Sequence, residues 1–409
     1  NPIWTKAEKE QILTVANFTA HRSPERFIYR GLSLNSRHID WHMFSEVSMR
    51  QYMKDEIRER LQMIRDTAES ADGRCITPSH ETLLHLAAGL GEVQLLNRLL
   101  QRHADPNVQI ILPQQAFPSI PDSEQGNTPL TYACQPGMDD STPLPVHNRI
   151  SCLNLLIQYG ADVNKPGPLG WPPLVITCVA GIGGAPYEEA ALFLLKCGAD
   201  ISLQPELKGK KTSLLTWATA AGYPLLVRKL CEAGYDPNFR GEMAPPLLSL
   251  NLNTPNTALQ IAHILLEYGA DVNAAMPAST TLPETTGDTA LLNLCRQLAF
   301  IDVSQLPQIR ELVSLFISEG ADVNHQNAAG ETPLMACCRG MLLGDDSLDR
   351  LKLGIARLLL DHRADPSLRD KYGRTALQRI GNRSNEHLQM VLKYLPELSA
   401  PPLPKKENR

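Results

Sequence analysis

A stretch that ends in Gly-Ala-Asp-Val-Asn recurs along this chain and constrains its fold more than any other feature. In its clearest copy, residues 155–164, an apolar helix end runs into Gly160 and then into a polar turn. Glycine readily adopts the left-handed backbone that terminates helices. The seven copies carry, in their turns, Asp105, Asp162, Asp200, Asp236, Asp271, Asp322 and Asp365. A helix-ending motif that recurs this often predicts a repeat array rather than several unrelated domains.

A second motif, close to Thr-Pro-Leu-His-x-Ala-Ala, begins the other half of each unit. Clear copies are residues 82–88, 128–134 and 332–338, and a degenerate one lies near residues 245–247. Threonine caps a helix, proline fits its first turn, and alanine lets neighbouring helices approach closely. Aromatic residues are only 5% of the chain, so leucine and alanine must do most of the packing. The sequence therefore predicts thin helix pairs that stack on one another.

With both motifs in hand, the chain resembles the ankyrin-repeat proteins over roughly residues 77–395. The resemblance implies an all-α ankyrin-repeat solenoid, built from helix pairs with β-turn fingers. We expect a small helical region in residues 1–75 that caps the array, and about seven to eight irregular repeats in residues 76–395. Residues 396–409, rich in Pro and Lys, are expected to form a flexible tail.

Most of the nine cysteines follow the repeat rather than a metal or disulfide pattern, and Cys75 is the one that the repeat does not explain. The second small position of the Thr-Pro-Leu-His-x-Ala-Ala motif is taken by Cys134, Cys178, Cys295 and Cys338, and Cys337 takes the position before it. A buried free cysteine packs as a small hydrophobic residue. We therefore expect no metal, no cofactor and a reducing compartment.

Most catalytic signatures are absent, among them Gly-x-x-x-x-Gly-Lys, His-Glu-x-x-His, Gly-x-Ser-x-Gly and Cys-x-x-Cys. His85 fills the His position of the repeat motif, where it is expected to order a turn. The sequence thus predicts that the chain is not an enzyme. A net charge of −5 gives no reason to expect nucleic-acid binding, and no apolar run approaches membrane-spanning length. We expect a cytoplasmic monomer.

Candidate partner-binding residues come from what varies between the copies. The first-helix position that points outward includes Tyr132 and Ile176, and Lys208, Lys210, Lys211, Phe239 and Arg240 form the strongest basic and aromatic cluster. That cluster either docks an acidic segment or is a solvated turn. Trp171 and Trp217 complete the candidates. Trp217 is interpreted as filling an Ala position, so that either the stack opens there or the side chain turns outward to bind.

The uneven spacing of the turn Asp residues predicts insertions. Two of them lengthen fingers, at residues 110–125 and 275–286. Three lengthen the loop between paired helices, at residues 135–148, 297–307 and 340–349. Insertions in solenoids often lie on the binding face, although neutral loop drift would give the same pattern.

Two functional hypotheses follow. The first is a non-enzymatic scaffold that recognises a protein partner through its concave face and fingers, as the ankyrin resemblance implies. The second is an adaptor, or an effector that a bacterium secretes into the host cytoplasm, whose N-terminal region carries a separate activity targeted by the repeats. The irregular, inserted repeats behind a non-repeat region resemble such ankyrin-type bacterial effectors.

Overall fold

A computed structural model describes most of the repeat region. The described residues are 82–110, 126–135, 146–167, 170–182, 187–202, 206–207, 210–211, 213–239, 244–278, 285–298, 306–339, 346–380 and 391–399. They divide into two compact units, one ending at Leu207 and the other following it. The helical region expected in residues 1–75 lies outside the described residues.

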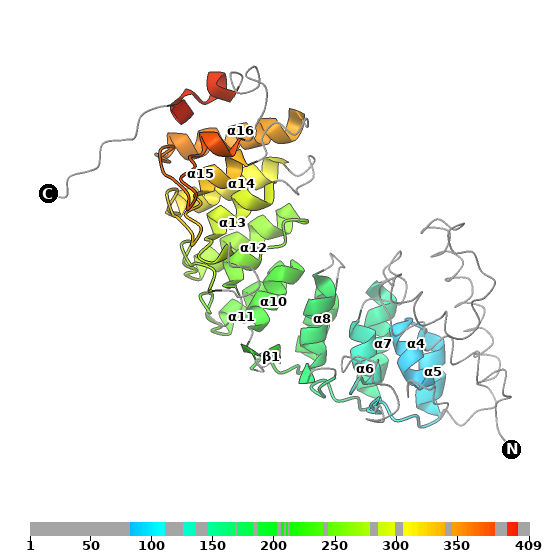
Figure 1. The fold of residues 1–409 in the computed structure, drawn as a ribbon. Helices are drawn as coiled ribbons and strands as arrows, with labels where there is room; N and C mark the ends of the chain where they lie inside the picture. The colour runs from blue at the N-terminus through cyan, green and yellow to red at the C-terminus, as the bar shows by residue number, and fades with distance from the viewer. Residues whose placement is uncertain are drawn as a thin grey trace, which may run out of the picture. The chain divides into compact units, whose positions relative to one another are not determined.

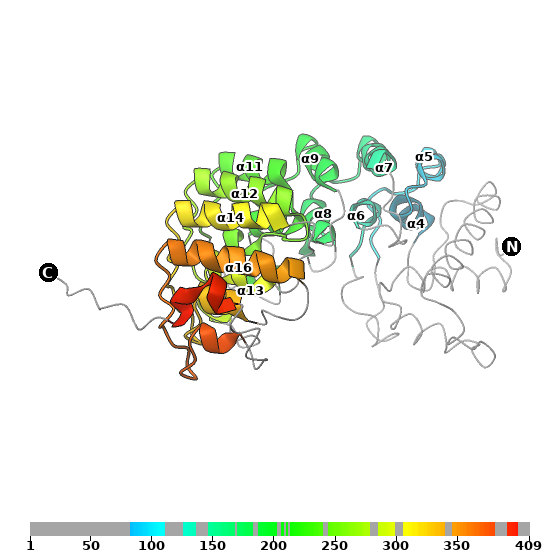
Figure 2. The same ribbon diagram turned by 90° about the horizontal axis from the view of Figure 1, so that it is seen from above.

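The first unit is a two-layered stack of helix pairs. Its pairs are α4 (Leu83–Gly89) with α5 (Val93–Gln101), α6 (Pro129–Cys134) with α7 (Val146–Gln158), and α8 (Pro173–Gly181) with α9 (Glu188–Lys196). The inner helices α4, α6 and α8 pack in sequence on one another, and so do the outer helices α5, α7 and α9. Figure 2 shows these two rows. Strand β1 (Glu206–Leu207) ends the unit.

The second unit repeats this plan with a less regular inner layer. It contains β2 (Lys210–Lys211), α10 (Leu214–Ala221), α11 (Pro224–Glu232), η4 (Pro246–Ser249), α12 (Pro255–Glu267), α13 (Ala290–Gln297), α14 (Leu306–Ser318), α15 (Pro333–Cys338), α16 (Asp346–Asp361), η8 (Leu377–Arg379) and η9 (Pro396–Ser399). The outer helices α11, α12, α14 and α16 pack successively, as Figure 1 shows. The degenerate 245–247 motif yields only the 3-10 turn η4. The predicted all-α fold of stacked helix pairs is confirmed.

The left-handed stops are where the sequence predicts them. Gly160, Gly198, Gly234, Gly269 and Gly320 have φ between 85° and 93°. The two copies without glycine place His103 and Arg363 at the same point, with φ of 62° and 68°. Each outer helix therefore ends at one kind of backbone turn, whichever residue occupies it.

The polar turn after each stop joins neighbouring repeats. Its Asp stays local: the Asp322 carboxylate accepts a hydrogen bond from the Asn324 N–H at 2.9 Å. Its Asn reaches the next turn: Asn273 Nδ2 donates to the Gly320 carbonyl at 3.0 Å, and Asn273 Oδ1 accepts from the Asp322 N–H at 2.8 Å. We call this pair of bonds the asparagine clamp. The same clamp is made by Asn107, Asn164, Asn238 and Asn324.

The cysteines pack as predicted. Cys134, Cys178, Cys295, Cys337 and Cys338 are at most 1% exposed, and all are free thiols. Burial raises the pKa of Cys134 to about 11 and that of Cys337 to about 12, so both stay neutral. They pack in the core of the repeats as small hydrophobic side chains.

The interpretation of Trp217 as filling an Ala position is wrong by one residue. Ser213 caps α10, its hydroxyl accepting from the Leu215 N–H at 3.2 Å. Trp217 N–H donates to the Ser213 carbonyl, as Tyr132 N–H donates to the Thr128 carbonyl. Trp217 therefore shares the outward position with Tyr132, and Ala218 takes the small one. No overpacking has to be relieved by an opening of the stack.

The predicted insertions fall between the expected elements, but the bounds predicted for the three interhelical ones are too wide, because α7 begins at Val146, α14 at Leu306 and α16 at Asp346. Ile110 and Asn127 close the base of one lengthened finger, and Met276 and Asp288 that of the other. The three interhelical insertions fall between α6 and α7, α13 and α14, and α15 and α16. The tail begins later than residue 396, because Leu398 of η9 is 4% exposed and Glu397 pairs with Arg357 at 2.8 Å.

Candidate functional site

The structure places the candidate residues unevenly. Tyr132, Ile176, Trp171 and Trp217 are 5%, 7%, 9% and 8% exposed, so each offers a partner only a small edge. Of the basic and aromatic cluster, Phe239 is half-buried, and Lys210 and Lys211 form β2. Lys208 and Arg240 lie outside the described residues. A binding role for these nine residues stays a prediction.

A larger polar assembly that the sequence did not predict joins the last repeats. We call it the arginine network, and it consists of Asp288, Glu331, Asp370, Arg296, Arg339, Arg374 and Arg379. Asp288 and Glu331 each directly precede the Thr that caps an inner helix, α13 or α15. Arg296 and Arg339 stand at the ends of those two helices. The repeat geometry thus brings each acidic residue beside an arginine.

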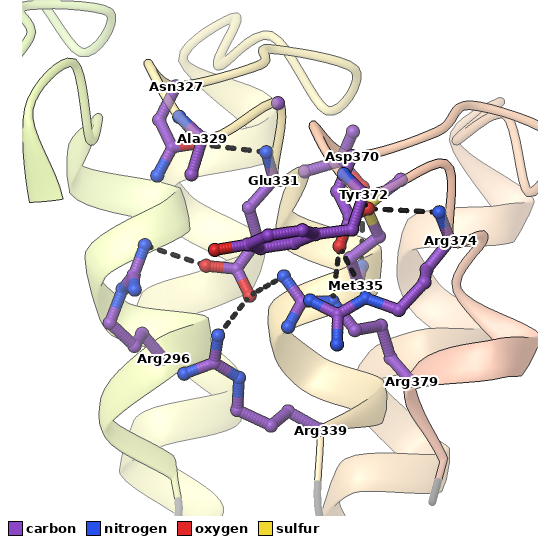
Figure 3. Close-up of polar contacts among 12 residues, drawn as sticks. Arg296, Asn327, Ala329, Glu331, Met335, Arg339, Asp370, Tyr372, Arg374 and Arg379 are labelled. Atoms are coloured by element: carbon purple, nitrogen blue, oxygen red, sulfur yellow. Dashed lines mark hydrogen bonds and ion pairs between the residues drawn. The ribbon is translucent and has the colours of Figure 1, made fainter. Parts of the chain in front are cut away.

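Glu331 is the centre of the network, and only 1% of it is exposed. Its Oε1 accepts from Arg339 and Arg379, each at 3.0 Å, and its Oε2 accepts from Arg296 at 2.8 Å. Figure 3 shows the three guanidinium groups converging on this carboxylate. They come from α13, from the end of α15 and from η8. One buried carboxylate therefore connects three successive repeats.

The two flanking carboxylates are held differently. Burial alone would raise the pKa of Asp370, but hydrogen bonds from the backbone N–H groups of Arg374 and Tyr372, together with the Arg374 side chain, leave that pKa lowered. Arg379 also pairs with Asp370, at 3.1 Å. Burial raises the pKa of Asp288, although Asn327 donates to it at 2.7 Å and Arg296 at 3.0 Å.

The network has a buried side and a solvent side. The side chains of Arg379 and Arg296 are 9% and 15% exposed, whereas those of Arg339 and Arg374 are 47% and 43% exposed. Its four arginines exceed its three carboxylates by one charge. The excess is carried by the guanidinium groups that face water.

An exposed aromatic ring stands next to Arg374. Tyr372 is 64% exposed, with Lys371 Nζ 5.0 Å and Arg374 Cζ 4.7 Å from its ring centroid, as in cation–π pairs. We define the tip surface as Arg339, Arg369, Lys371, Tyr372 and Arg374. Sequence reasoning missed it because its members are unremarkable singly. The available signal was a charged residue directly before Thr289, Thr332 and Thr375.

The finger that carries residues 369–374 of the tip surface is anchored by its backbone. Lys371 N–H donates to the Ala329 carbonyl of the preceding finger at 2.9 Å. Gly330, at φ 69°, lets the two fingers approach, because a Cβ there would lie 3.0 Å from Lys371 N and 3.1 Å from Asp370 Cα. The tip surface therefore stands on a base with a fixed conformation.

In the part of the chain that the structure describes, no three His, Cys, Asp or Glu side chains come together as metal ligands would. Searching the same residues finds no helix with the length and apolarity to cross a membrane.

Comparison with known proteins agrees with the architecture. The ankyrin-repeat model matches residues 79–110, 125–167 and 329–371. Human protein phosphatase 1 regulatory subunit 27 is 39% identical over 51 residues, which is 12% of this chain and 30% of that protein. Ankyrin repeat protein FPV031 of fowlpox virus (strain NVSL) is 28% identical over 177 residues, which is 43% of this chain and 44% of the viral protein.

A bacterial relative is matched over more of its length. Ankyrin repeat protein YahD of Escherichia coli (strain K12) is 28% identical over 199 residues, which is 48% of this chain and 85% of that protein. The chain spans less than half of the regulatory subunit and of the viral protein. The segments that the family model matches contain the stops at His103, Gly160 and Arg363 and the clamp asparagines Asn107 and Asn164. The chain therefore contains ankyrin repeats in the three segments that the family model matches.

Proposed function

We propose that this chain is a non-enzymatic recognition protein, which binds a protein partner through the inner-helix face and the fingers of its ankyrin repeats. The observation that carries the proposal is the tip surface, where an exposed ring and exposed cations stand on a buried ion-pair network. Exposed aromatic and arginine side chains on a fixed base are typical of the residues that dominate protein interfaces.

The relatives support the same class of function. The human relative is named as a regulatory subunit of a phosphatase, and a subunit acts in contact with another protein. The similarity spans 30% of that protein, so we do not transfer its partner to this chain. A cytoplasmic location and a monomeric state stay predictions from the sequence.

Affinity capture with the full-length chain as bait tests the proposal. One variant reverses the sequence-predicted cluster, with Lys208→Glu, Lys210→Glu and Arg240→Glu, and a second carries Lys371→Glu and Tyr372→Ser in the tip surface. The control carries Lys393→Glu and Tyr394→Ser, which change an exposed Lys-Tyr pair outside the fingers. We expect a finger variant to lose a protein that the control retains, as mass spectrometry of the captured proteins would show.

If both finger variants fold normally and recover the same proteins as the control, the fingers are not the binding site and the proposal fails. The competing hypothesis, an adaptor or secreted bacterial effector with an activity in residues 1–75, concerns residues outside those described. It predicts that residues 1–75, expressed alone, fold and retain that activity.

A further inference from the structure

We infer that the tip surface binds an acidic peptide segment of the partner protein, with the partner's carboxylates paired to Arg339 and Arg374 and its chain lying across Tyr372. The inference rests on the proposed function and names the chemistry of the partner. It draws on three features of the described residues, namely anchored arginines, an unbalanced charge and one exposed ring.

The first feature is that the two exposed arginines are already oriented. Arg339 uses Nη2 on Glu331 at 3.0 Å, and Arg374 uses Nε on Asp370 at 3.0 Å while stacking on Tyr372. The remaining guanidinium N–H groups belong to side chains that are 47% and 43% exposed. A side chain fixed at one edge loses less conformational entropy when it binds a ligand at the other. The planar guanidinium also matches a carboxylate through paired hydrogen bonds.

The second feature is charge that the fold itself does not neutralise. Glu331 already accepts from three guanidinium groups, and Asp370 from two. The network has one more arginine than carboxylate, and the exposed Arg369 and Lys371 raise the local excess to three. The chain as a whole has a charge of −5. A positive surface on an acidic protein selects negatively charged segments and speeds their encounter.

The third feature separates a peptide from a nucleic acid. Single-stranded nucleic acid is held by several stacking rings along an extended basic groove. The tip surface offers one ring, Tyr372, flanked by Lys371 and Arg374. The overall negative charge also opposes a long polyanion. A short acidic peptide, with side-chain carboxylates around one aromatic contact, fits this surface better.

Fluorescence anisotropy with the full-length chain tests the inference. The probe is a short fluorescein-labelled peptide of alternating Asp and Glu, and its neutral counterpart replaces them with Asn and Gln. We expect the acidic probe alone to bind, and Lys371→Glu with Tyr372→Ser to weaken it at least about tenfold, a change of about 1.4 kcal/mol. Arg339→Gln should weaken binding of the probe as well, because it removes one of the two arginines that pair with its carboxylates. We expect this variant to stay folded, since Glu331 keeps Arg296 and Arg379.

The matched control is Lys393→Glu with Tyr394→Ser, which makes the same change of charge and ring area on a Tyr that is 58% exposed. It should leave the affinity within about twofold. Thermal unfolding of each variant shows whether it is folded. If the double variant is not folded, Arg339→Gln alone still tests the inference.

Three results would overturn the inference: no binding of the acidic probe, equal loss in the tip and control variants, or displacement of the probe by a single-stranded oligonucleotide at a lower concentration than by unlabelled peptide. If the probe does not bind but the finger variants still lose a captured protein, this inference fails and the proposed function stands. If they lose none, both fail.

Discussion

At the scale of single residues, Glu331 pairs with more arginines than the other two carboxylates of the arginine network. It is buried and accepts from three arginines of successive repeats. Removing one partner of a buried ion pair leaves the others without compensation, which costs more than the pair gains by forming. The network therefore makes the last repeats depend on one another.

We predict that Glu331→Gln lowers the free energy of unfolding by about 3 kcal/mol, because three guanidinium groups lose their shared charge partner. Urea unfolding followed by circular dichroism measures this. The control is Glu319→Gln, an exposed position at the end of α14, where the change should stay within about 0.5 kcal/mol. Equal effects at the two positions would contradict the importance assigned to the network.

His85 is structural, as the sequence predicts. Its Nδ1 accepts from the Thr82 N–H at 3.2 Å, and its Nε2–H donates to the Asn127 carbonyl of the next repeat at 3.1 Å. Thr131 occupies the same position in the next repeat and accepts from the Thr128 N–H at 2.8 Å. Both side chains complete the capping box at the N-terminus of an inner helix.

Burial lowers the pKa of His85 from 6.5 to about 4. At pH values between these two, the unfolded chain binds a proton that the folded chain does not. The contribution of His85 to stability is therefore present in full above pH 6.5 and decreases as the pH falls through this window. We predict a loss from this group of about 2 kcal/mol between pH 6.5 and 5. His85→Thr, which copies Thr131, should remove it. Identical pH dependence of unfolding in the two proteins would show that folding does not lower the pKa of His85.

At the scale of elements, the shortest inner α-helices are each capped at the C-terminus by a cationic side chain of their partner helix. α6 and α15 are each followed by an interhelical insertion. Arg149 of α7 donates to the Ala133 and Gln135 carbonyls, and Lys352 of α16 donates to that of Arg339. Both cations are 1% exposed. A cation at a helix C-terminus satisfies free carbonyls and opposes the negative end of the helix dipole.

The outer helices supply a prediction from their stops. Arg363 holds a φ of 68°, which is unfavourable for a side chain with a Cβ. Arg363→Gly should raise the stability of the last repeats by about 1 kcal/mol, since the clamp from Asn324 uses only the backbone carbonyl. Gly320→Arg makes the reverse change at a position where the added Cβ would have no neighbouring atom within 4 Å. It should lower stability by a similar amount. A lower Tm for Arg363→Gly would contradict this account of the stops.

At the scale of the whole molecule, the repeat periodicity predicted most of the fold. Stops, small positions and insertions are local features, so each copy could be compared directly with the others. The register of α10 could not be fixed in this way, because Thr212 and Ser213 are both good caps. The hydrogen bonds that Leu215 and Trp217 donate from their backbone N–H groups to Ser213 decide the register, and with it the place of Trp217.

The candidate site was far less accessible to sequence reasoning. Arg379 and Glu331 are 48 residues apart and meet only because the repeats stack. The predicted anchors Tyr132 and Ile176 vary between copies, but the same stacking buries them. Sequence variation between the copies therefore does not distinguish a residue that binds a partner from one that contacts the neighbouring repeat.

Hydrogen–deuterium exchange of the chain, alone and with a captured protein partner, tests the recognition account most directly. The account predicts slower exchange in residues 369–374 and in the inner helices α13 and α15. The outer helices α12, α14 and α16 should be unchanged. Protection confined to the outer helices, or to residues 1–75, would contradict it.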